Sequence, residues 1–236
     1  MMLKLGYIGL TIAVCVLLIH FGFTAIDKTF NEESRKRKKT ILISGLVLWQ
    51  VYIFFVAASG FIQTFSFPPR FALSMIIPSF IFIGMFVYQN RDKSWIMNIS
   101  PNWLFFFQSF RILVELLFVG SVAAGLLHNE ASIEGYNFDM VYAFTILIVG
   151  YFVFVKQAAG LRLIRAWNYL GLLVLASIIF VFMSTIYKPE LYGATEPMLP
   201  IDGLTYPYVL VAGFLMPVAV FIHVLSITQL NRLIKK

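Results

Sequence analysis

The stretch Leu104–Leu127, LFFFQSFRILVELLFVGSVAAGLL, is almost entirely apolar and is long enough to cross a bilayer as a helix. Two charged residues, Arg111 and Glu115, lie inside it. Because they are four positions apart, they occupy one face of a helix, one turn from each other. A charge near the bilayer centre costs about 2.5–3.5 kcal/mol on insertion scales, so such residues usually face the bundle interior and serve a function there.

The composition of the whole chain is that of a membrane protein. Of its 236 residues, 60% are hydrophobic and only 12% are charged, whereas soluble domains contain about 25% charged residues. The net charge of +7 does not indicate nucleic-acid binding, because the basic residues lie in the short segments between apolar runs. We therefore expect a single polytopic membrane domain over residues 1–236, in contact with the lipid bilayer and with no nucleic-acid partner.

Seven apolar runs are each close to the ~20 residues that span a bilayer. They predict an all-α, seven-transmembrane bundle with helices over residues 3–26, 40–63, 71–90, 104–127, 141–159, 167–187 and 207–229. The most basic segment, residues 28–39, follows the first run. The positive-inside rule places that segment in the cytoplasm, so the N-terminus is expected outside and the C-terminus in the cytoplasm.

Isolated polar side chains gather in the inner half of this predicted bundle when depth is counted at ~1.5 Å per residue. They come from the first, second, fourth and seventh predicted helices: His20, Gln50, Gln108, Arg111, Glu115 and His223. In a lipid environment such side chains should face the bundle interior and one another.

The sequence alone is compatible with three interpretations of this set. Arg111 and Glu115 could form an ion pair within one helix that only fixes helix packing. Arg111 could instead bind the head of a small anionic or amphipathic ligand in a polar pocket, with its neighbours as donors or proton carriers. Finally, His20 and His223 have matching predicted depth and could be the axial ligands of a b-type haem.

A second group of polar residues lies near the predicted helix ends. Arg70 follows a double proline in an outer loop, and Asn137 and Asp139 precede the fifth predicted helix. Asp139 could cap that helix or pair with Arg70 at an outer mouth. Asn168, at the inner start of the sixth predicted helix, has the same ambiguity between an N-cap and a site residue.

Several function classes are excluded by missing signatures. The seventh predicted helix has no lysine that could bind retinal, and no G-x-S-x-G or H-E-x-x-H motif occurs. The single cysteine, Cys15, cannot form an internal disulfide, and no Cys/His spacing indicates zinc. The leading prediction is a membrane protein that binds or moves a small molecule. The alternatives are a membrane-embedded enzyme or b-haem electron carrier and a structural subunit of a membrane complex. No cofactor is predicted outside the haem alternative, and the protein partner could be a second copy of the chain or a membrane complex.

Five short motifs together resemble a family of bacterial polytopic inner-membrane proteins of the Bacteroidota, a family without an assigned activity. They are Pro68-Pro69-Arg70, Arg111-Ile-Leu-Val-Glu115, Asn137-Phe-Asp139, Trp167-Asn168 and the segment from Pro217 to His223. The chain departs from the family pattern at Leu113, where the family has proline, and at residues 133–136, where the family tends to have Thr-Phe-x-Gly. The resemblance implies a multi-pass protein of the bacterial inner membrane. It also singles out one set of residues for the site: Arg70, Arg111, Glu115, Asn137, Asp139, Asn168 and His223.

Overall fold

A computed structural model describes residues 1–235, which form helices and connecting loops without any β-strand. The long helical segments are α1 (Met2–Thr29), α2 (Glu32–Ala58), α3 (Ile77–Asn90), α5 (Phe110–Ala123), α6 (Asp139–Gly150), α7 (Leu161–Tyr187) and α8 (Met216–Ile234). Shorter helical pieces are η1 (Ala72–Ile76), η2 (Ser94–Asn98), α4 (Pro101–Phe107), η3 (Asn129–Ala131), η4 (Tyr151–Val155), η5 (Pro189–Tyr192), η6 (Ile201–Leu204) and η7 (Val211–Leu215).

Six helical segments of the described chain are long and apolar enough to cross a membrane. They are Met2–Thr29, Glu32–Ala58, Ala72–Asn90, Pro101–Ala123, Leu161–Tyr187 and Val211–Ile234. These segments confirm the prediction of an all-α, multi-pass membrane protein. The fifth predicted helix corresponds to Asp139–Val155, which is apolar but shorter than the other six. At 1.5 Å per residue it is about 25 Å long, less than the ~30 Å thickness of the hydrocarbon core.

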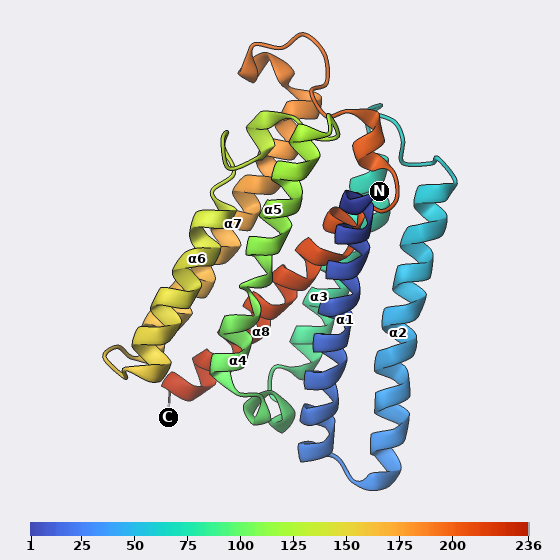
Figure 1. The fold of residues 1–236 in the computed structure, drawn as a ribbon. Coiled ribbons are helices and arrows are strands. Elements are labelled where there is room, and N and C mark those ends of the chain that lie inside the picture. Colours follow the sequence, from blue (N-terminus) through green and yellow to red (C-terminus); the bar gives the residue numbers. More distant parts are fainter. Residues whose placement is uncertain (236) are drawn as a thin grey trace.

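The short α6 begins inside the bundle rather than at its end. Figure 1 shows α6 starting part-way along the neighbouring α7, and the connection from α5 descends to meet it. Residues of this connection are buried, with Ala131, Ser132 and Asn137 only 0–2% exposed. Non-helical backbone is tolerated at membrane depth only where protein covers it or where it lines a cavity.

Three of the predicted helices are interrupted or displaced. The run 104–127 is broken at Gln108 and Ser109, between α4 and α5. The prolines Pro78 and Pro217 each follow a π-helical turn, η1 and η7 respectively. Proline has no amide hydrogen to donate to the carbonyl of the preceding helical turn, so that turn takes the wider π-helical form. In η7 the carbonyl of Gly213 accepts a hydrogen bond from Trp49 Nε1 at 2.9 Å.

The helix α8 lies at the centre of the bundle. It crosses the middle of the molecule and packs against α3, α4 and α7 (Figure 1). In the most apolar stretch of the segment Val211–Ile234, which joins η7 to α8, 61% of the residues are buried, compared with 11% for α2. The helix α2 packs mainly on α1 and exposes large apolar side chains such as Leu48 and Phe55. Because polar residues in a membrane bundle face inward, α8 is where a buried site is expected.

Candidate functional site

Arg111 lies in the first turn of α5, just after the break in the helix, and is 1% exposed. Its Nη2 forms an ion pair with the carboxylate of Asp139, the first residue of α6. Its Nη1 lies 3.0 Å from Nε2 of His223, and its Cζ lies 4.7 Å from the ring centroid of Tyr142. The interpretation in which Arg111 and Glu115 form an ion pair within one helix is therefore wrong, because Arg111 is paired across helices.

His223 is completely buried and uses both ring nitrogens. Its Nδ1 lies 2.8 Å from Oδ1 of Asn168, whose Nδ2 donates to the carbonyl of Ile164 at 2.8 Å. The amide oxygen only accepts and the Arg111 guanidinium only donates, so we assign the proton of a neutral imidazole to Nδ1. Neither nitrogen is left for a haem iron.

Asn137 positions the second carboxyl group of the site. Its Nδ2 donates to Glu115 Oε1 at 2.8 Å and to the carbonyl of Ala131 at 3.1 Å. Its Oδ1 accepts from the backbone N–H of Asp139 at 2.9 Å. Glu115 is 1% exposed, and its Oε2 is buried without a hydrogen-bond partner among the described residues.

The six side chains that meet here form what we call the polar cluster: Arg111, Glu115, Asn137, Asp139, Asn168 and His223. The alternative in which Asp139 pairs with Arg70 is wrong, because Asp139 pairs with Arg111. Arg70 is exposed and stacks on Phe61, with its Cζ 5.2 Å from the ring centroid. Asn168 is not an N-cap, because α7 begins earlier, at Leu161.

Three other predicted site residues take different places. Gln108 is buried and donates from Nε2 to the carbonyl of Ala219 at 2.9 Å, which ties the α4–α5 break to α8. Gln50 is half-buried on α2, with its Nε2 4.0 Å from Cys15 Sγ, outside the polar cluster. His20 is exposed on α1, so it does not join the buried His223, and the two histidines of the alternative haem interpretation do not meet.

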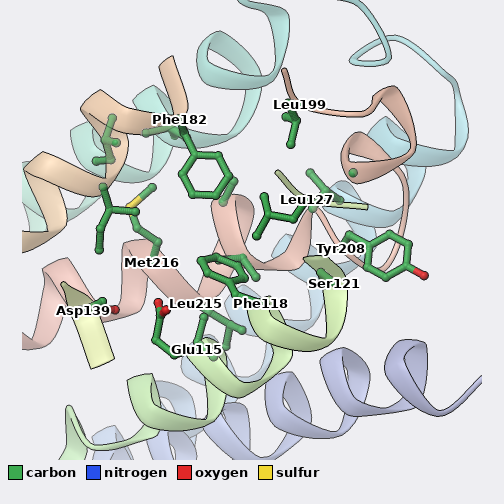
Figure 2. Close-up of a pocket in the computed structure, with 18 of the residues that line it drawn as sticks. Glu115, Phe118, Ser121, Leu127, Asp139, Phe182, Leu199, Tyr208, Leu215 and Met216 are labelled. Carbon is green, nitrogen blue, oxygen red and sulfur yellow. The ribbon is translucent and has the colours of Figure 1, made fainter. Parts of the chain in front are cut away.

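A cavity of about 130 Å³ adjoins the polar cluster. Figure 2 shows Glu115 and Asp139 at one end of it and apolar side chains, among them Phe118 and Phe182, around the rest. The cavity lies between α5, α7, η7 and α8, and Leu199 of the α7–η7 connection lines it as well. An engineered apolar cavity of about 150 Å³ binds benzene, so this space suits one aromatic ring or a short alkyl chain.

The charges at this end of the cavity do not balance. Arg111 and Asp139 neutralise each other, and Glu115 forms no ion pair within the described part of the chain. An anionic ligand would therefore meet an unpaired carboxyl group and an arginine whose two Nη atoms are already bound, with only Nε lacking a partner among the described residues. Within residues 1–235, no group of three or more His, Cys, Asp and Glu side chains is placed to hold a metal ion.

Sequence reasoning missed two aromatic residues and one glycine. Tyr142 lies three residues after Asp139, on the same face of α6, and its hydroxyl donates to the carbonyl of Trp167 at 2.8 Å. Tyr7 of α1 reaches the cavity, where its hydroxyl lies 2.7 Å from Ser121 Oγ. Gly171 allows α7 to approach closely, because a Cβ there would overlap His223 and Tyr142.

No protein-family model matches the chain, and no curated protein and no solved structure is significantly similar to it. The function is therefore inferred from the geometry of the site.

Proposed function

We propose that the protein is a seven-span protein of the bacterial inner membrane that binds a small amphipathic molecule in the cavity beside the polar cluster. In this proposal Asp139–Val155 is the short fifth span, and the bound molecule is sensed or moved across the membrane. The resemblance in sequence motifs is the basis for the inner membrane as the location.

The distribution of basic residues supports an outside N-terminus. The basic segment 28–39 lies around the turn between α1 and α2, and other basic residues begin α7 and end α8. Figure 1 places these three regions at one end of the bundle and the N-terminus at the other. The connection 128–140, away from the basic end, has no lysine or arginine. Under the positive-inside rule the basic end is cytoplasmic.

The observation that carries the binding proposal is the buried Glu115 Oε2 at the polar end of an apolar cavity. Apolar walls favour an apolar body by about 25 cal/mol per Å² of surface removed from water. A buried polar atom without a partner is costly, so a head group that satisfies Glu115 is favoured. Ligand sites of this kind combine mostly apolar lining with a few polar groups that fix orientation.

The geometry favours a neutral or cationic head over the anionic head that the sequence suggested for Arg111. Its guanidinium already binds Asp139 and His223 and lies over Tyr142. The cavity volume also favours a small ligand over a whole lipid.

Benzyl alcohol tests this proposal, because it combines one aromatic ring with a hydroxyl group that donates a hydrogen bond. Binding to the purified protein in lipid nanodiscs is measured by ligand-observed NMR and by the shift in thermal unfolding. Ala212 lines the cavity, whereas Ala13 is exposed on α1. We expect saturable binding that Ala212→Phe abolishes and the matched variant Ala13→Phe preserves.

Two outcomes would contradict the proposal: no saturable binding to the wild type, or equal binding to Ala212→Phe. Either one would favour the alternative that the protein is a structural subunit of a membrane complex, in which the polar cluster only fixes helix packing.

A further inference from the structure

Glu115 stands out as a buried carboxyl group that lines the cavity and forms no ion pair within the described part of the chain, since the nearby Arg111 is paired with Asp139. Its Oε1 is held by Asn137, and its Oε2 has no partner among the described residues. Figure 2 shows the carboxyl group at the edge of the cavity, close to that of Asp139. The Asp139 carboxylate, in contrast, has its cation in Arg111.

The other titratable groups around Glu115 do not supply that cation. Arg111 on α5 is bound to Asp139 on α6, and His223 on α8 is neutral through its two hydrogen bonds. Tyr7 on α1 bonds Ser121 with its hydroxyl. The remaining group, Tyr208 before η7, lines the cavity, and its ring meets that of Tyr7 edge to face at 5.4 Å.

An ionised carboxylate that is buried without a counter-ion is strongly unfavourable. The Glu115 carboxyl group therefore holds either a proton or a cationic group. The cavity next to it is apolar and has room for one ring or a short chain. A primary ammonium group on a small apolar body matches both features.

We propose that Glu115 is a site for which a proton and a small organic cation compete. The ammonium group of the cation donates a hydrogen bond to Glu115 Oε2, and its apolar body occupies the cavity. The exchange is balanced: the cation binds as R–NH3+, the carboxylic acid becomes a carboxylate, and one proton leaves to water. This inference rests on the proposed binding of an amphipathic molecule and names its chemical class.

Such an exchange gives the site a means of coupling a proton to a solute. The same carboxyl group cannot hold both cations, so each bound ammonium ion releases one proton. Intramembrane carboxyl groups commonly mark ion and proton pathways for this reason. Charge-assisted hydrogen bonds are roughly twice as strong as neutral ones, so we expect an ammonium ligand to bind about tenfold more tightly than its alcohol counterpart once Glu115 is ionised.

The experiment compares benzylammonium, benzyl alcohol and benzoate on the wild-type protein in nanodiscs, from about pH 5 to about pH 8. Benzylammonium keeps its charge over this range, because amine pKa values lie near 10. Affinity is measured by ligand-observed NMR. Proton release is measured with a pH indicator in weak buffer.

We expect the affinity for benzylammonium to rise with pH by up to about tenfold per unit, with one proton released per ligand. The affinity for benzyl alcohol should change little, and benzoate should not bind. Glu115→Gln should remove the pH dependence and the advantage of benzylammonium over benzyl alcohol. If that variant does not fold, the pH series and the proton count on the wild type still decide.

The outcomes separate this inference from the proposal on which it rests. If benzyl alcohol binds and benzylammonium binds no more tightly at any pH, the cation inference is wrong and the proposed function stands. The same holds if benzylammonium binds without releasing a proton. If none of the ligands binds, both are wrong.

Discussion

The ion pair between Arg111 and Asp139 should make these two residues strongly coupled in stability. The side chains are 2% and 6% exposed, so both charges are removed from solvent. Breaking a buried pair by removing one partner typically costs about 3–5 kcal/mol, because the remaining charge is left uncompensated. We expect Asp139→Asn to lower the free energy of unfolding by this amount.

The losses in the free energy of unfolding caused by Asp139→Asn and by Arg111→Gln should differ, because only one of the two stranded groups can be neutralised. In Asp139→Asn, the arginine cannot lose its proton and stays charged in the bundle. In Arg111→Gln, the stranded carboxylate can be neutralised by taking a proton. We therefore expect Arg111→Gln to cost less than Asp139→Asn, although it also loses the bond to His223 and the contact with Tyr142.

The double variant Arg111→Gln/Asp139→Asn carries neither charge. It should be more stable than Asp139→Asn alone, with a coupling energy of about 2 kcal/mol between the two sites. Unfolding in mixed micelles with increasing SDS, followed by circular dichroism, measures all four proteins of the cycle. Asp202→Asn is the matched control, because Asp202 is exposed in the α7–η7 connection.

The reasoning would be refuted by either of two results. Asp139→Asn could unfold at the same SDS fraction as Asp202→Asn, which would mean that the buried charge needs no partner. Alternatively, the effects of the two single variants could simply add in the double variant, which would mean that the side chains do not interact.

Three further predictions concern packing, topology and pH. Gly171→Ala should lower the free energy of unfolding by about 1–3 kcal/mol, because its Cβ would overlap the side chains next to it. Gly160→Ala, which has open space around it, should lower it less in the same SDS titration, and equal losses for the two variants would contradict the close approach of α7. In a cysteine-free background, a membrane-impermeant maleimide added to intact cells should label Glu196→Cys and not Lys36→Cys, and the reverse pattern would overturn the outside N-terminus. Burial lowers the pKa of His128 in the α5–α6 connection, so this histidine binds a proton more readily in the unfolded state. The stability of the protein should therefore fall as the pH drops below about 6.5. Thermal unfolding measured across pH should show this fall in the wild type and not in His128→Gln.

The membrane spans were predictable because they depend on local hydrophobicity and length. The first span was expected over residues 3–26, and the structure has the apolar helix Met2–Thr29 there. The place where α6 begins was not predictable in this way. Composition cannot distinguish a loop that stays at the surface from one that descends into the bundle, because in both cases the chain is polar and non-helical.

The depth of α6 also explains which parts of the site were predicted. The sequence singled out Arg111, Asp139 and His223 because ionisable groups in apolar surroundings stand out, and in the structure these three side chains meet. The ion pair between Arg111 and Asp139 was not predicted, because the sequence placed Asp139 at the outer end of a full-length helix and therefore far from the depth of Arg111. The prediction that His20 faces the bundle interior was wrong for another reason. The helix α1 is apolar around its whole circumference, so its sequence does not show which face packs against the bundle.

The cavity was beyond sequence reasoning for a physical reason. Its lining combines residues of α5 with residues of α7, η7, α8 and Leu199, which come from separate parts of the chain. The volume of the cavity depends on how these elements pack, and a cavity between side chains cannot be predicted from any single apolar residue. The sequence indicated only a polar pocket around Arg111 and Glu115, and it gave no sign of the apolar space beside them.

The most direct test of the account is where a small amphipathic molecule binds. Anomalous diffraction from crystals grown with 4-bromobenzyl alcohol locates the bromine independently of any model of the ligand. We predict a peak inside the cavity, near Phe118 and Phe182, with the hydroxyl group directed to Glu115. Bromine only at the lipid-facing surface, with none in the cavity, would contradict the claim that this cavity is a binding site.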